Sequence, residues 1–127
     1  MTPIQNAHRL TSIFGTWPSF HDAEVLKLEL DRTEPSITLQ LFAFQTTSTT
    51  DSEGYYKRIH ECIVTFRFHS VEDVSLEGFN HQNVVAGISF ERRARVDVLI
   101  EPLHGIAGSF SCSSAEVVDV KSIGGPS

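Results

Sequence analysis

The sequence is poor in residues that mark particular classes of protein: its 127 residues include two cysteines, one tryptophan, one methionine and no long hydrophobic run. No apolar stretch approaches the roughly 18 residues that a membrane-spanning helix needs. The N-terminus also lacks a basic region followed by an apolar stretch and a cleavage site, the pattern of a secretory signal. We therefore expect a cytoplasmic protein that has no membrane partner.

The two cysteines, Cys62 and Cys112, show no spacing that is typical of a metal site. Each lies within an alternating apolar run, where cysteine behaves as a small hydrophobic residue. Because disulfides are rare in the cytosol, the sequence predicts reduced, buried thiols rather than a disulfide or a catalytic nucleophile.

Basic residues are scarce, since 10 lysines and arginines stand against 16 acidic residues and give a formal net charge of −6. This balance argues against a nucleic-acid partner, because phosphates attract basic patches. An acidic surface attracts basic partners, although ordinary solubility explains the same balance more simply. The sequence also has no G-x-S-x-G, no H-E-x-x-H and no phosphate-binding glycine loop. We expect neither an enzyme nor a cofactor.

The length and the hydrophobic content of 40% are those of one folded domain, residues 1–127. A Thr2-x-x-Gln5 capping box and a left-handed residue at Gly15 predict the two ends of one short helix. From Glu24 onward the apolar period changes to two, which is typical of strands. The alternating segments are residues 24–31, 37–44, 56–70, 84–90, 96–100, 106–112 and 117–120.

The predicted class is α+β: one short N-terminal helix followed by a mostly antiparallel β-sheet of six or seven strands, curled into a sandwich or partial barrel. Residues 46–54 are expected to form a polar loop, and residues 71–79 an irregular crossover or a one-turn helix. Three of the strands should bury one alternating set each: Leu26, Leu28 and Leu30; Ile37, Leu39, Leu41 and Ala43; Cys62, Val64, Phe66 and Phe68.

Two segments are unusual for connectors. The first, FGTWPSFHDAEV (residues 14–25), joins the helix to the first strand and is rich in aromatic residues, which connectors seldom contain. Its Trp17 suits a core anchor better than an interface hot spot. The second, LEGFNHQNV (residues 76–84), carries four amide or imidazole side chains in a row. These either cap backbone groups or form a polar recognition surface, and the residue types leave both interpretations open.

Two other functions compete with a binding surface. His21, Asp22 and Glu24 suggest a metal-dependent hydrolase, but neighbouring side chains of an extended chain point to opposite faces. A third ligand must then come from His60, His69 or His81, so bonds to backbone groups at the joint are favoured. The second alternative is a small-ligand-binding β domain, whose curled sheet would enclose a pocket lined by Phe42, Phe44, Phe66 and Phe68.

Residues 14–25 resemble the N-terminal signature of the immunity protein 50 (Imm50) family of bacterial polymorphic toxin systems, and residues 76–84 resemble its central signature. The segment GIAGSFSC (residues 105–112) is similar to its closing strand. The resemblance implies a cytosolic protein that binds and neutralises a cognate toxin without catalysis. The net charge suggests a basic toxin, such as a nuclease. The sequence leaves open whether the protein is a monomer or a homodimer.

On this interpretation, the residues of the two motifs either contact the toxin or fix the fold. If the motifs adjoin, they form one end of the sheet. The candidates are Trp17, His21, Asp22, Glu24, Phe79, His81, Gln82 and Asn83.

Overall fold

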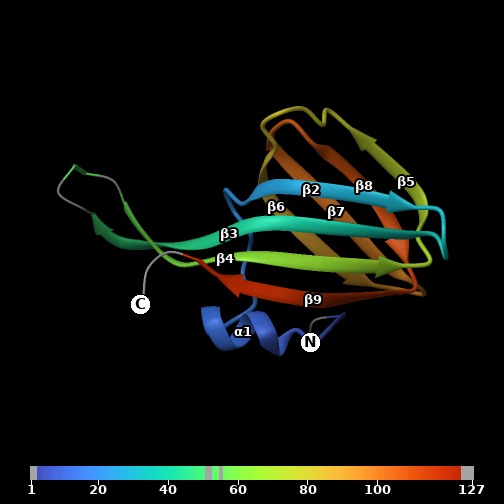
Figure 1. The fold of residues 1–127 in the computed structure, drawn as a ribbon, viewed down its shortest axis with the longest axis horizontal. Helices are drawn as coiled ribbons and strands as arrows, with labels where there is room; N and C mark the ends of the chain where they lie inside the picture. Colours follow the sequence, from blue (N-terminus) through green and yellow to red (C-terminus); the bar gives the residue numbers. More distant parts are fainter. Residues whose placement is uncertain (1–2, 51–52, 55, 124–127) are drawn as a thin grey trace.

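The computed structural model describes residues 3–50, 53–54 and 56–123. Within this part of the chain, one short helix accompanies nine strands that form a single sheet, in the order β1-β9-β4-β3-β2-β6-β7-β8-β5 (Figure 1). The elements are β1 (Ile4–Gln5), α1 (His8–Phe14), β2 (Glu24–Asp31), β3 (Ser36–Thr50), β4 (Tyr56–His69), β5 (Glu72–Glu77), β6 (Val84–Arg92), β7 (Val96–His104), β8 (Ala107–Cys112) and β9 (Ser114–Ser122).

The predicted fold class was therefore wrong. The protein is nearly all β, with nine strands in one continuous mixed sheet, instead of an α+β sandwich or barrel of six or seven antiparallel strands. The sheet is mixed because Ile4 and Gln5 pair in parallel with Ala115 and Glu116. Residues 72–77, expected to be irregular, form β5 and pair with β8. In both segments, strand pairing with a distant part of the chain overrides the local pattern.

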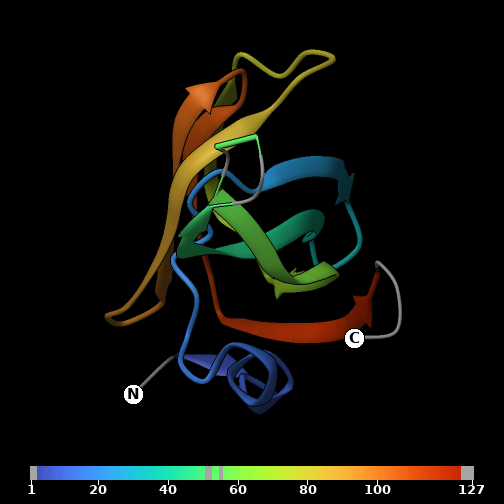
Figure 2. The same cartoon turned by 90° about the vertical axis from the view of Figure 1, so that its left-hand side faces the viewer.

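The sheet turns back on itself where β2 meets β6, because these two strands are paired only at Glu24 and Val84. The strands β9, β4, β3 and β2 lie in front of β6, β7, β8 and β5, and Figure 2 shows the same two layers edge-on. The core fills the space between the layers. Phe68 of β4 contacts Phe110 of β8 with ring centroids 5.0 Å apart, and Phe66 contacts Phe90 of β6 at 5.7 Å.

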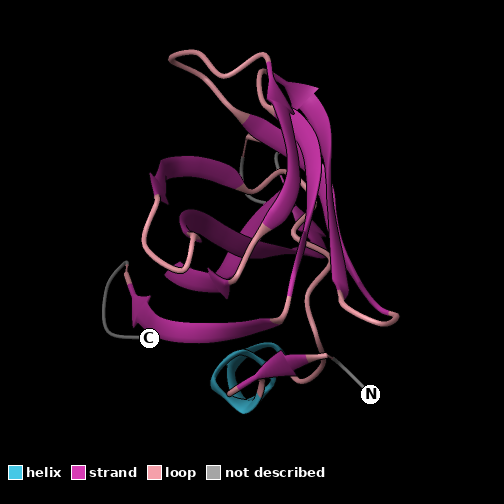
Figure 3. Cartoon of the chain, turned by 90° about the vertical axis from the view of Figure 1, so that its right-hand side faces the viewer, coloured by secondary structure: helices cyan, strands magenta, loops and turns pink. Residues whose placement is uncertain are grey.

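The helix α1 lies along β9, at the edge of the front layer (Figure 3). Its predicted end is confirmed: Gly15 has a φ of 81°, and its N–H donates to the Thr11 carbonyl at 2.8 Å. The predicted start was wrong, because the helix begins only at His8 and residues 4–5 are a strand. Thr2 of the expected capping box lies outside the described residues. The described helix is too short to cross a membrane.

The predicted inward faces of β3 and β4 are confirmed, since all eight of their residues named above are buried. The prediction for β2 was wrong at Leu26 and Leu30, which are 44% and 58% exposed. A β-bulge between Val25 and Lys27 interrupts the alternation. Beyond Glu24, β2 also has no partner on its β6 side among the described pairings.

The polar loop expected at residues 46–54 was also wrong over its first part, because β3 continues to Thr50 and β4 begins at Tyr56. The hairpin thereby runs past its neighbours: β2 pairs with β3 only as far as Phe42, and β9 pairs with β4 only as far as Cys62. We call its free part, residues 44–50 and 56–60, the arm. It projects from the body of the sheet in Figure 1.

Candidate functional site

The two sequence motifs meet at the point where the layers join. The Asp22 N–H donates to the Val85 carbonyl and the Val85 N–H donates to the Ala23 carbonyl, both at 2.9 Å. The Val25 N–H donates to the Asn83 carbonyl at 2.8 Å. Residues 14–25 and 76–84 therefore adjoin at one end of the sheet. We call this region the junction.

Asn83 organises the junction from within. It is only 3% exposed, the one buried polar residue in the described chain. Its Oδ1 accepts the backbone N–H groups of Asn80 at 3.0 Å and Ile106 at 3.1 Å, and its Nδ2 donates to the Asn80 carbonyl at 2.6 Å. The Asn83 side chain thus ties the 78–83 loop to the start of β8. It holds the loop in shape together with Asn80, whose Nδ2 donates to the Gly78 carbonyl at 2.9 Å and whose Oδ1 accepts the Gln82 N–H at 2.8 Å. In Asn83, the capping interpretation of the polar run is correct.

A tight glycine contact completes this arrangement. Gly105 has a φ of 80°, and a Cβ there would lie 2.5 Å from both Asn83 Oδ1 and the Gln82 carbonyl oxygen. Real Cβ atoms do not approach oxygen so closely, so any larger residue would displace the loop. The third segment of the resemblance, residues 105–112, therefore begins in direct contact with the second.

Trp17 covers the core beside the junction. Its indole is half-buried and makes edge contacts with Phe20 at 5.8 Å, Phe90 at 5.9 Å and Phe66 at 6.3 Å between ring centroids. These rings come from the first motif and from both layers. The prediction that Trp17 is a core anchor is consistent with this packing.

The remaining candidates carry their side chains at or near the surface. Phe79 is 57% exposed, which is unusual for a large aromatic residue, and His81 and Gln82 beside it are exposed too. His21 is exposed, and its Nδ1 lies 3.1 Å from the carbonyl oxygen of Ala86, so it bonds to backbone, although to a group of β6 and not of the joint itself. Asp22 is exposed and Glu24 is half-buried. The junction thus has a buried, fold-determining part and an exposed polar and aromatic part.

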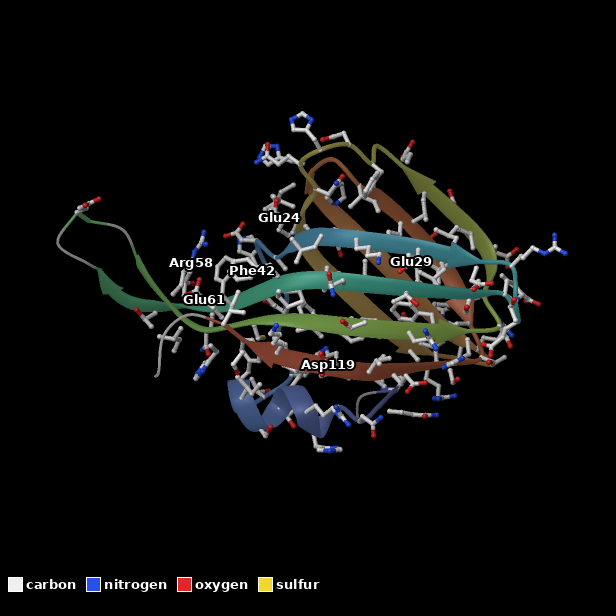
Figure 4. All side chains as sticks on the ribbon, in the orientation of Figure 1. Glu24, Glu29, Phe42, Arg58, Glu61 and Asp119 are labelled. Carbon is white, nitrogen blue, oxygen red and sulfur yellow. The ribbon has the colours of Figure 1, made fainter. Side chains whose placement is uncertain are left out.

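Two pockets flank the junction where the arm begins, and Asp22 and Phe44 contribute to both. The larger, of about 340 Å³, lies between residues 14–22 and residues 44–46 of the arm. The smaller, of about 320 Å³, is lined by Asp22, Glu24, Phe42, Phe44, Arg58, Gln82, Val84, Leu103 and His104. We call the smaller one the acidic pocket. Figure 4 shows Glu24, Phe42 and Arg58 gathered around it, where the arm leaves the sheet.

Arg58 is a site residue that the sequence analysis missed. Its guanidinium carbon lies 4.1 Å from the centroid of the Phe44 ring, a cation–π contact. The contact depends on the pairing of Thr46 with Arg58 within the arm. Because residues 46–54 were expected to form a loop, the sequence held no signal for this register.

The structure does not assemble the residues that the predicted small-ligand pocket or metal-dependent hydrolase would require. Phe66 and Phe68 are fully buried in the core, whereas Phe42 and Phe44 line the acidic pocket, so the four rings do not enclose one cavity. Among the described residues, no group of three or more histidine, cysteine, aspartate or glutamate side chains is placed to hold a metal ion. His60 packs against Phe14, and His69 lies between Glu34 and Glu116.

The cysteines are unpaired and buried, as predicted. Burial raises the pKa of both the Cys62 and the Cys112 thiol to about 11. At neutral pH the thiols therefore stay protonated, and they are poor nucleophiles.

The fold and the junction define a small, acidic, nearly all-β protein in which the most unusual sequence segments meet at one end. The model of the immunity protein 50 family matches residues 6–123, a range that contains both motifs and the closing segment. The chain belongs to the Imm50 family. No match was found among curated proteins or among solved structures.

Proposed function

We propose that this protein is a bacterial immunity protein that binds and neutralises a cognate toxin in the cytoplasm, without catalysis. The observation that carries the proposal is the family match over residues 6–123, which includes the whole junction. A protein of this kind inhibits by occupying the active site of the toxin or a surface that the toxin needs.

The exposed part of the junction is the surface that we assign to the toxin. Phe79 is a large exposed aromatic side chain on a loop that the buried Asn83 amide holds in one conformation. A rigid loop loses little conformational entropy when it binds, and aromatic side chains are frequent hot spots at interfaces. His81 and Gln82 supply adaptable hydrogen-bonding groups next to this ring.

The charge of the chain indicates the character of the partner. A formal net charge of −6 favours a basic toxin, such as a nuclease, because complementary fields accelerate association. Such association should slow markedly as salt is added, since exposed charges are screened.

The test is growth rescue. The chain is co-expressed with the protein encoded next to it, and survival is compared with that of cells that express the neighbouring protein alone. We expect rescue and a complex that survives gel filtration. A toxic neighbour that the chain neither binds nor suppresses would contradict the proposal for that pair.

A matched pair of variants then tests the surface. Phe79→Ala should weaken rescue and complex formation, whereas Leu30→Ala should leave both unchanged. The two residues are 57% and 58% exposed, but Leu30 lies near the opposite end of β2 from the junction. Equal effects of both changes, or no effect of Phe79→Ala, would contradict the assignment of this surface while leaving the immunity role intact.

A further inference from the structure

The acidic pocket combines negative charge with aromatic walls. Asp22 and Glu24 contribute carboxylates from the first motif, and Phe42 and Phe44 contribute rings from β3. Glu24 and Phe42 are direct cross-strand partners, so a carboxylate and a ring stand side by side on the outer face of the sheet. Gln82 of the second motif also lines the pocket, which places it next to the exposed surface described above.

The two carboxylates are available to a ligand. Among the described residues, Glu24 makes no ion pair, and Asp22 has only the exposed His21, whose Nε2 lies 3.6 Å from Asp22 Oδ1. By contrast, Glu29, further along the same strand, is paired with Lys27 at 3.0 Å.

The protein itself shows which group fits the aromatic wall. The Arg58 guanidinium lies over the Phe44 ring, 4.1 Å from its centroid, without a carboxylate partner among the described residues. A planar guanidinium can stack on a ring and donate to carboxylates at the same time, which an ammonium group does less well. The pocket therefore offers both an aromatic ring and carboxylates to a guanidinium, but Arg58 contacts only the ring.

We propose that the acidic pocket receives an arginine side chain of the partner protein. The partner guanidinium stacks against Phe44, donates to the carboxylates of Asp22 and Glu24, and displaces Arg58 from the ring. The identity of the partner as a toxin rests on the proposed function, whereas the chemistry of the pocket does not. Because two carboxylates and one guanidinium line the pocket, it favours an incoming cation.

The first experiment measures the dissociation constant of the complex with the toxin. Glu24→Gln and Asp22→Asn remove one charge each and preserve side-chain size, and each should weaken binding about tenfold. Glu29→Gln is the matched control, because it makes the same change on the same strand outside the pocket, as Figure 4 shows. The melting temperature of each variant shows that it is folded.

Arg58 provides the most specific outcome. If it competes with the partner for Phe44, then Arg58→Gln should tighten binding severalfold, since the variant removes both the competitor and its positive charge. Weaker binding by Arg58→Gln would overturn the proposal, because Arg58 would then be part of the contact. Equal affinities of the wild type, Glu24→Gln and Asp22→Asn would also overturn it, and rescue of growth would show that the immunity role still stands.

The second experiment does not depend on the toxin. N-acetyl-arginine amide is titrated into the whole protein and followed by the NMR shifts of backbone amides, with the uncharged N-acetyl-citrulline amide as the isosteric control. We expect saturable shifts at Glu24, Phe42 and Phe44 with arginine only, lost in Glu24→Gln and kept in Glu29→Gln. Identical shifts with both compounds, or none with either, would overturn the proposal even if rescue succeeds.

Discussion

Replacing Asn83 with alanine tests whether one buried amide holds the junction together. The change leaves the buried N–H of Ile106 without its acceptor, which costs about 1–3 kcal/mol. It also removes two bonds to the backbone of Asn80, where water can partly substitute, at about 0.5–1 kcal/mol each. The expected loss in the free energy of unfolding is about 3 kcal/mol. For a domain of this size, that corresponds to a fall of roughly 10 °C in melting temperature.

Chemical denaturation followed by fluorescence measures this loss directly. Trp17 is the only tryptophan, and its packing against core phenylalanines makes it a good reporter of unfolding. The control is Gln82→Ala, a change at the adjacent exposed residue, which should alter stability by less than about 0.5 kcal/mol. A loss of less than about 1 kcal/mol in Asn83→Ala would refute the reasoning, because it would mean that the loop keeps its shape without the amide.

Two further predictions concern strain and pH. Asp22 has a φ of 67°, a conformation that asparagine tolerates better than alanine. Asp22→Ala should therefore lower the free energy of unfolding by about 1 kcal/mol, whereas Asp22→Asn should change it little. Equal losses for the two variants in denaturation curves would contradict this. Hydrogen bonds to Glu116 and Glu34 raise the pKa of His69 above its usual 6.5, so protonated His69 stabilises the fold at low pH. At pH 6 the wild type should have a free energy of unfolding higher than that of His69→Gln by about 1 kcal/mol or less. This difference should shrink as the pH rises through the folded-state pKa of His69. A difference that grows with pH would contradict the role assigned to protonated His69.

The inward faces of β3 and β4 could be predicted because both of their neighbours are strands and the core lies on one side. Leu39 and Phe66 therefore follow a strict alternation that is visible in the sequence. The same rule failed on β2, where a bulge at Leu26 shifts the alternation and most of one edge is unpaired. A bulge leaves no reliable mark in a single sequence.

The sequence singled out the two motifs of the candidate site but not the way in which they meet. The composition of residues 14–25 and 76–84 marked them as unusual, yet the pairing of residues 22–25 with residues 83–85 is what brings them together. The acidic pocket could not be predicted from the sequence. Its lining depends on that pairing and also on the register that places Arg58 opposite Thr46. Residues 46–50 of the arm show no apolar alternation in the sequence, so their strand conformation could not be predicted without the pairing with β4.

On the proposed function, one short segment carries both the fold and the recognition of a partner. In residues 76–84, the loop conformation depends on Asn83, whose buried amide makes three hydrogen bonds to backbone groups. Phe79, His81 and Gln82 point outward and contribute little to that conformation. If the exposed three contact the toxin as proposed, a change among them should alter which toxin is bound while the loop keeps its shape. A change at Asn83 alters the shape itself, and with it every contact that the loop presents.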